Sequence, residues 1–222
     1  FMFLTLVFFY RYLISPTFTQ LAACAAFAGL ALLSKFSAVL IFPILLVAAL
    51  ASGKAKRIAL PRTALFLGLC LLTVWAGYFF EVKPLLTNTP APEKKIAEYQ
   101  RVGGPELVSF AKTVPVPLST FSSALISMVH TRAAGTNAFL MGEWSRHGWW
   151  YYYLIAFGIK NTIPFLLLCL LSFILLQRLG ASRTLGAVLV TPILFFFLIT
   201  LGDNAQAGIR YFLPIYPLFF VL

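Results

Sequence analysis

Long apolar runs alternate with short basic segments along this chain, and one polar stretch, residues 81–148, interrupts the pattern. A bilayer core about 30 Å thick requires roughly 20 apolar residues per helix, and the runs approach that length. They lack the two-residue alternation of a barrel strand, so helices are the expected form. Six or seven spans are predicted, over residues 1–14, 18–34, 37–51, 64–80, 164–176, 185–201 and 211–222.

The composition strengthens this interpretation. Of the 222 residues, 61% are hydrophobic and only 10% are charged, with a mean hydropathy of +0.92. A soluble domain of this size cannot bury so much apolar surface. The predicted fold is therefore all-α, a polytopic transmembrane helical bundle. Residues 1–80 would form transmembrane helices, 81–148 an extracytoplasmic loop with short helices, and 149–222 an interfacial segment followed by further transmembrane helices.

Basic residues predict the orientation of the bundle, because positive charge gathers on cytoplasmic loops. One connection carries Lys54, Lys56, Arg57 and Arg62, and another is flanked by Arg178 and Arg183. Placing both in the cytoplasm puts residues 81–148 outside. We expect a multi-pass protein of the cell (inner) membrane with its active face extracytoplasmic. This distribution and attraction to anionic membrane lipid account for the net charge of +11, so no nucleic-acid partner is expected.

Three further features concern the ends of the chain, its cysteines and its acidic residues. Phe1 is not an initiator methionine and the last apolar run has no exit, so an internal segment of a larger protein is expected. Cys24, Cys70 and Cys169 lie in apolar runs without metal or disulfide spacing. Only six acidic residues are present, which leaves a requirement for a divalent metal open.

The outer loop is too long and polar for a plain connection. Its prolines break long helices, but a short helix over residues 93–101 is possible and a second is predicted over residues 119–132. The second has apolar residues at helical spacing and is expected to lie along the membrane surface. Long ordered loops usually carry function, and we favour this over a flexible linker.

The loop returns to the membrane through a segment rich in tryptophan and tyrosine, residues 142–153. An interfacial aromatic belt explains these aromatic residues as a class. It explains less well why Glu143, Arg146 and His147 stand directly beside them. Lys160 follows, and such a lysine either extends outward to the interface or faces an anion; both alternatives stay open.

Arg210 has a similar setting at the last outer boundary, where a helix is expected to begin. A helix N-terminus together with a guanidinium group favours phosphate oxygens. The alternatives are an ordinary interfacial anchor, or an ion pair between Arg210 and Asp203 with no further role.

Three stretches of the sequence resemble motifs of a known protein family. Residues 29–35 read G-L-A-L-L-S-K, and residues 142–143 (G-E) precede G-W-W-Y-Y at 148–152, Lys160 and Pro164. Residues 208–217 read G-I-R-Y-F-L-P-I-Y-P. These are similar to motifs of the membrane glycosyltransferases of the GT-C superfamily, the bacterial relatives of the protein O-mannosyltransferases, which take sugar from a polyprenyl-phosphate carrier. Two places depart from the family pattern: Tyr153-Leu154 replaces Phe-Pro, and Asn161-Thr162 replaces Thr-Pro.

The resemblance implies inverting transfer of a mannose-like sugar to a hydroxyl of a protein, lipid or glycan acceptor. Lys160 and Arg210 would bind the carrier phosphate. The other expected substrate-binding residues are Glu143, Trp149, Tyr152 and Tyr211. The family's acidic general base would precede Phe1, so we assign no catalytic residue and no metal ligand.

Two other classes compete with this hypothesis. A secondary transporter or lipid flippase usually shows internal repeats and polar residues near the bilayer midplane, whereas here polar residues gather at the outer boundary. A non-catalytic membrane subunit remains the other alternative.

Overall fold

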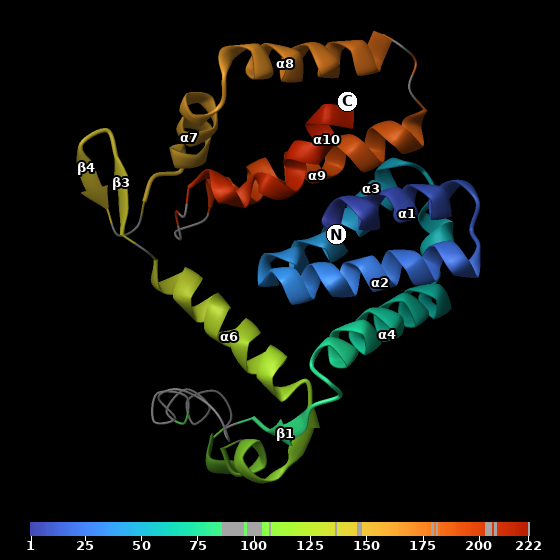
Figure 1. Cartoon of the computed structure of the whole chain (residues 1–222), viewed down its shortest axis with the longest axis vertical. Coiled ribbons are helices and arrows are strands. Elements are labelled where there is room, and N and C mark those ends of the chain that lie inside the picture. Colours follow the sequence, from blue (N-terminus) through green and yellow to red (C-terminus); the bar gives the residue numbers. More distant parts are fainter. Residues whose placement is uncertain are drawn as a thin grey trace.

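The structure, a computed structural model, describes residues 1–85, 96, 104–106, 108–135, 137–145, 148–178, 180, 182–202, 206 and 208–221 (Figure 1). Helices make up 76% of it. The α-helices are α1 (Met2–Ile14), α2 (Phe18–Ser34), α3 (Ile41–Ala51), α4 (Leu60–Gly77), α6 (Ser119–Ala134), α7 (Tyr152–Lys160), α8 (Ile163–Arg178), α9 (Arg183–Leu201) and α10 (Tyr216–Val221). The 3₁₀ helices are η1 (Phe36–Leu40), η2 (Ala55–Ile58), η3 (Ile209–Tyr211) and η4 (Leu213–Ile215).

Two or three of the described helices are long and apolar enough to cross a membrane. Two are α4 and α9. The pair α7–α8 is a third if these two helices, which meet at a bend of 113°, count as one span. The helices α1, α2 and η1–α3 are apolar but shorter. At 1.5 Å per residue the 13 residues of α1 extend about 20 Å, less than a bilayer core. Each predicted run therefore contains helix, but the number that qualify as full spans is smaller than expected.

Prolines explain two differences between predicted and observed helix bounds. The fourth helix begins at Leu60, before the predicted start at residue 64, because Pro61 lies in its first turn, where a missing N–H costs nothing. The third run divides into η1 and α3. Pro43 cannot donate a hydrogen bond to the Val39 carbonyl, which interrupts a regular helix at this point.

The helix α2 packs between α1 and α4, and α3 packs on α9 (Figure 1). Gly29 allows the close approach of α2 to α4. A Cβ atom on Gly29 would lie 2.6 Å from Thr73 Cβ and 2.8 Å from the Cys70 carbonyl oxygen. The shared core contains many fully buried side chains, among them Leu13, Ile44 and Val74.

Several helices carry leucines whose side chains are at least half exposed. Examples are Leu71 and Leu72 on α4, Leu168 and Leu170 on α8, and Leu198 on α9, which are 50–66% exposed. So large an apolar surface requires a non-aqueous neighbour.

Two short antiparallel ribbons add strands that the all-α prediction did not include, although the described structure is mostly helical. The strand β1 (Val82–Pro84) pairs with β2 (Pro115–Pro117), and β3 (Ala138–Leu140) pairs with β4 (Glu143–Ser145). Three-residue strands are too short to show a detectable alternation of apolar and polar residues. A helix is confirmed over the second predicted loop segment, as α6. The possible helix over residues 93–101 lies outside the described residues, apart from Ile96.

Candidate functional site

The predicted basic connections meet at one end of the helices, at the right in Figure 1. Arg57 Nη1 donates hydrogen bonds of 2.8 Å to the carbonyl oxygens of both Leu13 and Ile14. Arg183 Nε donates one of 2.8 Å to the Ala51 carbonyl. These contacts join the end of α1, the α3–α4 connection and the start of α9. Both arginines stabilise the ends of helices whose last carbonyls lack helical partners.

At the opposite end, Lys35 reaches the segment that carries Arg210. Lys35 follows α2, and its Nζ donates a 3.3 Å hydrogen bond to the Arg210 carbonyl oxygen. The same Nζ lies 5.0 Å from the centroid of the Tyr211 ring, in a cation–π contact. Sequence reasoning did not select Lys35 as a site residue, although it ends the first motif. The motif therefore marked Lys35, but the contact itself could not be predicted because it is made with a residue 175 positions away.

Lys160 lies beside the same segment. It is the last residue of α7 and is exposed. A Cβ atom on Gly208, whose φ is +76°, would lie 3.8 Å from Lys160 Nζ. Because Gly208 is two residues before Arg210, Lys35 and Lys160 both lie beside the backbone segment that carries Arg210. We call Lys35, Lys160 and Arg210 the basic cluster.

Aromatic rings pack against one another beside the basic cluster. Tyr153 is fully buried, and its ring centroid lies 5.8 Å from that of Tyr211 and 5.7 Å from that of Phe212. Tyr152 packs edge-on against Tyr153 at 5.3 Å. Phe157, one turn further along α7, lies 5.5 Å from Phe212. The aromatic segment at the start of α7 and the η3–η4 segment are therefore one packed unit.

Asn161 lies at the 113° bend between α7 and α8. Its Nδ2 donates a 2.7 Å hydrogen bond to the Phe157 carbonyl, and its Oδ1 accepts one of 2.7 Å from Tyr216 Oη. Its backbone is extended, with φ −104° and ψ 149°. The Asn161-Thr162 pair, where the chain departs from the family pattern, is thus the place where the helix direction changes.

Gln206 is a buried polar residue that sequence reasoning missed. It is 6% exposed, and its Nε2 donates a 2.6 Å hydrogen bond to the Trp149 carbonyl. Its Oε1 is buried and has no partner among the described residues. Gly148 has a φ of +65°, and a side chain there would collide with Gln206. No motif indicates Gln206, because its role depends only on this tertiary contact.

The expected helix start at Arg210 is wrong. Arg210 lies in the three-residue helix η3, and the next α-helix begins six residues later at Tyr216. Pro214 and Pro217 lack the backbone N–H that a continuous helix would use here. The contribution expected from a helix dipole is therefore absent, and only the guanidinium group remains as an anion ligand.

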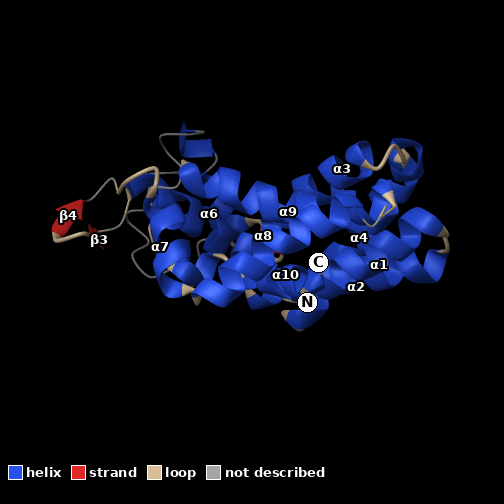
Figure 2. Cartoon of the chain, turned by 90° about the horizontal axis from the view of Figure 1, so that it is seen from above, coloured by secondary structure: helices blue, strands red, loops and turns tan. Residues whose placement is uncertain are grey.

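Glu143 does not join the basic cluster. It lies in β4 opposite Leu140 and is exposed, and the β3–β4 ribbon projects away from the helices in both views (Figure 1, Figure 2). The neighbouring Trp144 is 74% exposed and packs on Phe139 at 5.1 Å. Arg146, His147 and Asp203 lie outside the described residues.

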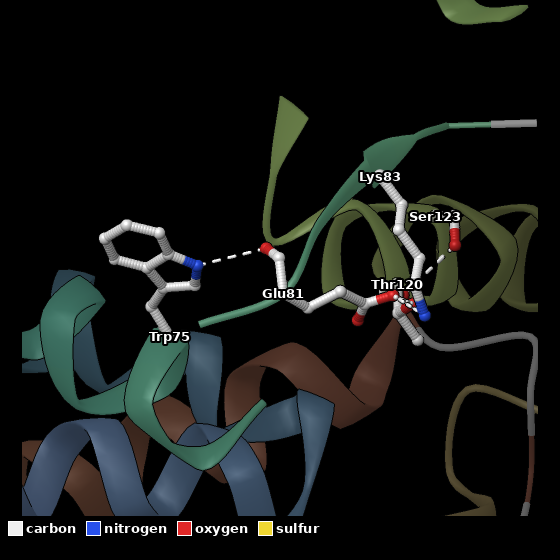
Figure 3. A network of polar contacts seen from close by, with 5 residues as sticks. All are labelled: Trp75, Glu81, Lys83, Thr120 and Ser123. Atoms are coloured by element: carbon white, nitrogen blue, oxygen red, sulfur yellow. Dashed lines mark hydrogen bonds and ion pairs between the residues drawn. The ribbon is translucent and has the colours of Figure 1, made fainter. Parts of the chain in front are cut away.

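Glu81 anchors the start of the loop over residues 81–148 to the end of α4 (Figure 3). Its backbone carbonyl accepts a 3.0 Å hydrogen bond from Trp75 Nε1. Its carboxylate accepts one of 2.9 Å from Thr120 Oγ1 and forms a 3.1 Å ion pair with Lys83. The bond from Thr120, and then the one from Lys83, lower the pKa of Glu81 below its ordinary value. The resulting stabilisation is present above the unfolded-state pKa and is lost as the pH falls through the lowered value. Glu81 is therefore a structural anchor, poorly suited to accept a proton.

Comparisons with models of protein families, with curated proteins and with solved structures found no match. The basic cluster and its surroundings are therefore the features of the described structure that bear on function. Within the described ranges, no three His, Cys, Asp or Glu residues come together as a metal site.

Proposed function

We propose that this chain is an integral membrane glycosyltransferase that moves a mannose-like sugar from a polyprenyl-phosphate carrier to an acceptor hydroxyl, with inversion. The observation that carries the proposal is the convergence of the three stretches that resemble the GT-C family. Lys35 ends the first stretch, Lys160 belongs to the second and Arg210 to the third, and they meet at one end of the helices.

Membrane embedding is supported by α4, α9 and the α7–α8 pair, and by the exposed leucines of the outer helices. The connections rich in lysine and arginine lie at the end opposite the basic cluster (Figure 1). With those connections in the cytoplasm, the basic cluster lies at the outer face of the membrane. A lipid-linked donor has its phosphate at this depth, because its tail stays in the hydrocarbon.

The chemistry requires positive charge where the phosphate leaves. The bond between the sugar C1 and the phosphate oxygen breaks as the acceptor oxygen attacks C1 from the opposite face. The leaving phosphate gains negative charge, which the ammonium groups of Lys35 and Lys160 and the guanidinium of Arg210 stabilise. The acceptor proton passes to a carboxylate acting as general base. The resemblance places that base before Phe1, and no described carboxylate lies in the basic cluster.

The remaining substrate contacts follow from the neighbouring residues. Trp149 and Tyr152 offer aromatic faces on which a sugar or an isoprenoid unit can stack. Gln206 Oε1, which lacks a partner among the described residues, is suited to accept a hydrogen bond from a sugar hydroxyl. Glu143 has no part in this arrangement.

One observation favours a second candidate, a lipid flippase or secondary transporter. The α7–α8 pair is a broken apolar helix, and discontinuous helices are common at the binding sites of transporters. The break lies beside the basic cluster, at an end of the helices. A flippase would move the intact donor lipid, whereas the proposed enzyme would release polyprenyl phosphate, and product analysis distinguishes them.

The test measures sugar transfer against carrier concentration in the full-length protein. We expect Lys160→Ala and Arg210→Ala each to lower the transfer rate at limiting carrier about thirtyfold, the equivalent of roughly 2 kcal/mol for a charge-assisted contact. Arg210→Lys should restore only part of the rate, since an ammonium lacks the planar fork.

Lys112→Ala is the matched control, because Lys112 is an exposed basic residue outside the basic cluster. Its kinetics should equal those of the parent. Unchanged kinetics in folded Lys160 and Arg210 variants would reduce these residues to interfacial anchors and would contradict the proposed site.

A further inference from the structure

A cavity of about 460 Å³ lies at the other end of the helices, beside the basic connections. Residues of α1, α2, α3, α4 and η2 line it, among them Phe9, Cys24 and Ile58. Phe42 of α3 and Phe66 of α4 meet at its side remote from the connection, with ring centroids 6.2 Å apart. Nothing in the proposed transfer reaction uses this space.

The interior of the cavity is suited to hydrocarbon. The hydroxyl groups of its wall already have partners within the chain: Tyr12 Oη donates 2.8 Å to the Arg57 carbonyl, and Thr63 Oγ1 donates 3.1 Å to the Ile58 carbonyl. The other lining side chains are mostly apolar. Leu46 and Leu67, which are 50% and 40% exposed, belong to both the lining and the outer surface of α3 and α4. An apolar chain can therefore enter from the side, where the surrounding lipid lies.

Two arginines give the cavity a positive margin. Arg57 Nη1 is used by the α1 carbonyls, but its Nε and Nη2 donate to nothing in the described part of the chain. The exposed Arg62 side chain likewise makes no hydrogen bond or ion pair with the described residues. No Asp or Glu occurs among residues 1–80. An anion at this margin meets no carboxylate from the four helices that form the cavity.

We propose that the cavity binds one acyl chain of an anionic glycerophospholipid from the surrounding bilayer, with the lipid phosphate on Arg57 and Arg62. A methylene group is close in size to a water molecule, whose share of liquid volume is about 30 Å³, so 460 Å³ holds roughly 15 of them. Arginine presents its N–H groups in the fork that matches a phosphate. The proposal requires a chain embedded in lipid but does not depend on the transferase reaction.

The test is native mass spectrometry of the detergent-purified chain with added dioleoyl phosphatidylglycerol or dioleoyl phosphatidylcholine. The parent should bind one phosphatidylglycerol at least about tenfold more tightly than phosphatidylcholine. Arg62→Gln should abolish that preference. Leu67→Trp, which fills the margin and keeps both arginines, should weaken the binding of both lipids.

Lys56→Gln is the matched control, since it removes one positive charge from the same connection but does not line the cavity. It should retain the preference for phosphatidylglycerol. Circular dichroism establishes that each variant keeps its helices.

Equal binding of the two lipids by the parent would overturn the role of the arginines, and unaltered binding by Leu67→Trp would overturn the acyl-chain site. Displacement of phosphatidylglycerol by equimolar polyprenyl phosphate would identify the carrier as the occupant and contradict the proposal.

Discussion

Asn161 shows how much of the shape near the basic cluster depends on a single side chain. Its amide group binds Phe157 on one side and Tyr216 on the other, so it joins the last turn of α7 to the start of α10. Phe165, just after the bend, stacks on Tyr216 with ring centroids 5.6 Å apart. The position of Lys160, the preceding residue, is thereby fixed relative to the segment that carries Arg210.

Asn161→Ala should lower the free energy of unfolding by about 2 kcal/mol, because two partly buried hydrogen bonds are lost at about 1 kcal/mol each. Tyr216→Phe removes one of them and should cost about 1 kcal/mol. The measurement is denaturant unfolding in detergent for both variants and the double variant. In the double variant the two effects should not add, since they share one bond. Full additivity would show that the Tyr216–Asn161 bond contributes nothing.

At the scale of elements, the contact between α2 and α4 depends on a position without a side chain. Gly29 faces Thr73 and Cys70 at distances that no Cβ atom tolerates. Gly77, the last residue of α4, leaves room for the Leu33 side chain of α2, which a Cβ atom there would meet. Gly29 thus lets the two helices approach closely, as small residues commonly do between membrane helices, and Gly77 admits a side chain of the partner helix.

Gly29→Ala should destabilise the protein by about 2 kcal/mol, the usual cost of inserting a methyl group into a well-packed contact. Gly68→Ala is the control. Gly68 also lies within α4, but nothing is within 4 Å of a Cβ there, so the better helix former should add about 0.5–1 kcal/mol. Thermal unfolding in the same detergent compares them. A Gly29→Ala variant as stable as Gly68→Ala would mean that the helices separate without cost.

The helices were the most predictable elements, because length and hydropathy are local properties of a run. The residues that end an apolar run, such as Lys35, were predictable as boundaries for the same reason. The contact of Lys35 with Arg210 was not, since nothing local relates two positions so far apart in the sequence. Gln206 was missed because it has no motif, and the helix expected at Arg210 failed because two nearby prolines outweighed the apolar run.

For the whole molecule, the two ends of the helices differ in charge. All the acidic residues, namely Glu81, Glu93, Glu98, Glu106, Glu143 and Asp203, belong to the loop over residues 81–148 or to the segment after α9. The connections at the other end carry lysine and arginine but no acidic residue, whereas the loop end carries charges of both signs. This separation supports the orientation in which the loop is extracytoplasmic.

Cysteine labelling tests the orientation. The native cysteines are buried, so an added cysteine can report alone. Met141→Cys, at a residue that is 76% exposed on the β3–β4 ribbon, should react with an impermeant maleimide in intact cells. Lys56→Cys should react only after permeabilisation. The reverse pattern would place the basic cluster in the cytoplasm and exclude the proposed donor site.

The same charge separation has an electrical consequence. The molecule has a permanent asymmetry of charge along the membrane normal, so it has an energy in the membrane field. In the proposed orientation the end without acidic residues lies on the negative side of an energised membrane, and moving one of its positive charges to the other side would cost about 2.3 kcal/mol per 100 mV. In that orientation the potential that the cell maintains therefore opposes inversion of the molecule, in addition to any contribution from the helices themselves, and favours an outward position for the proposed sugar-transfer end.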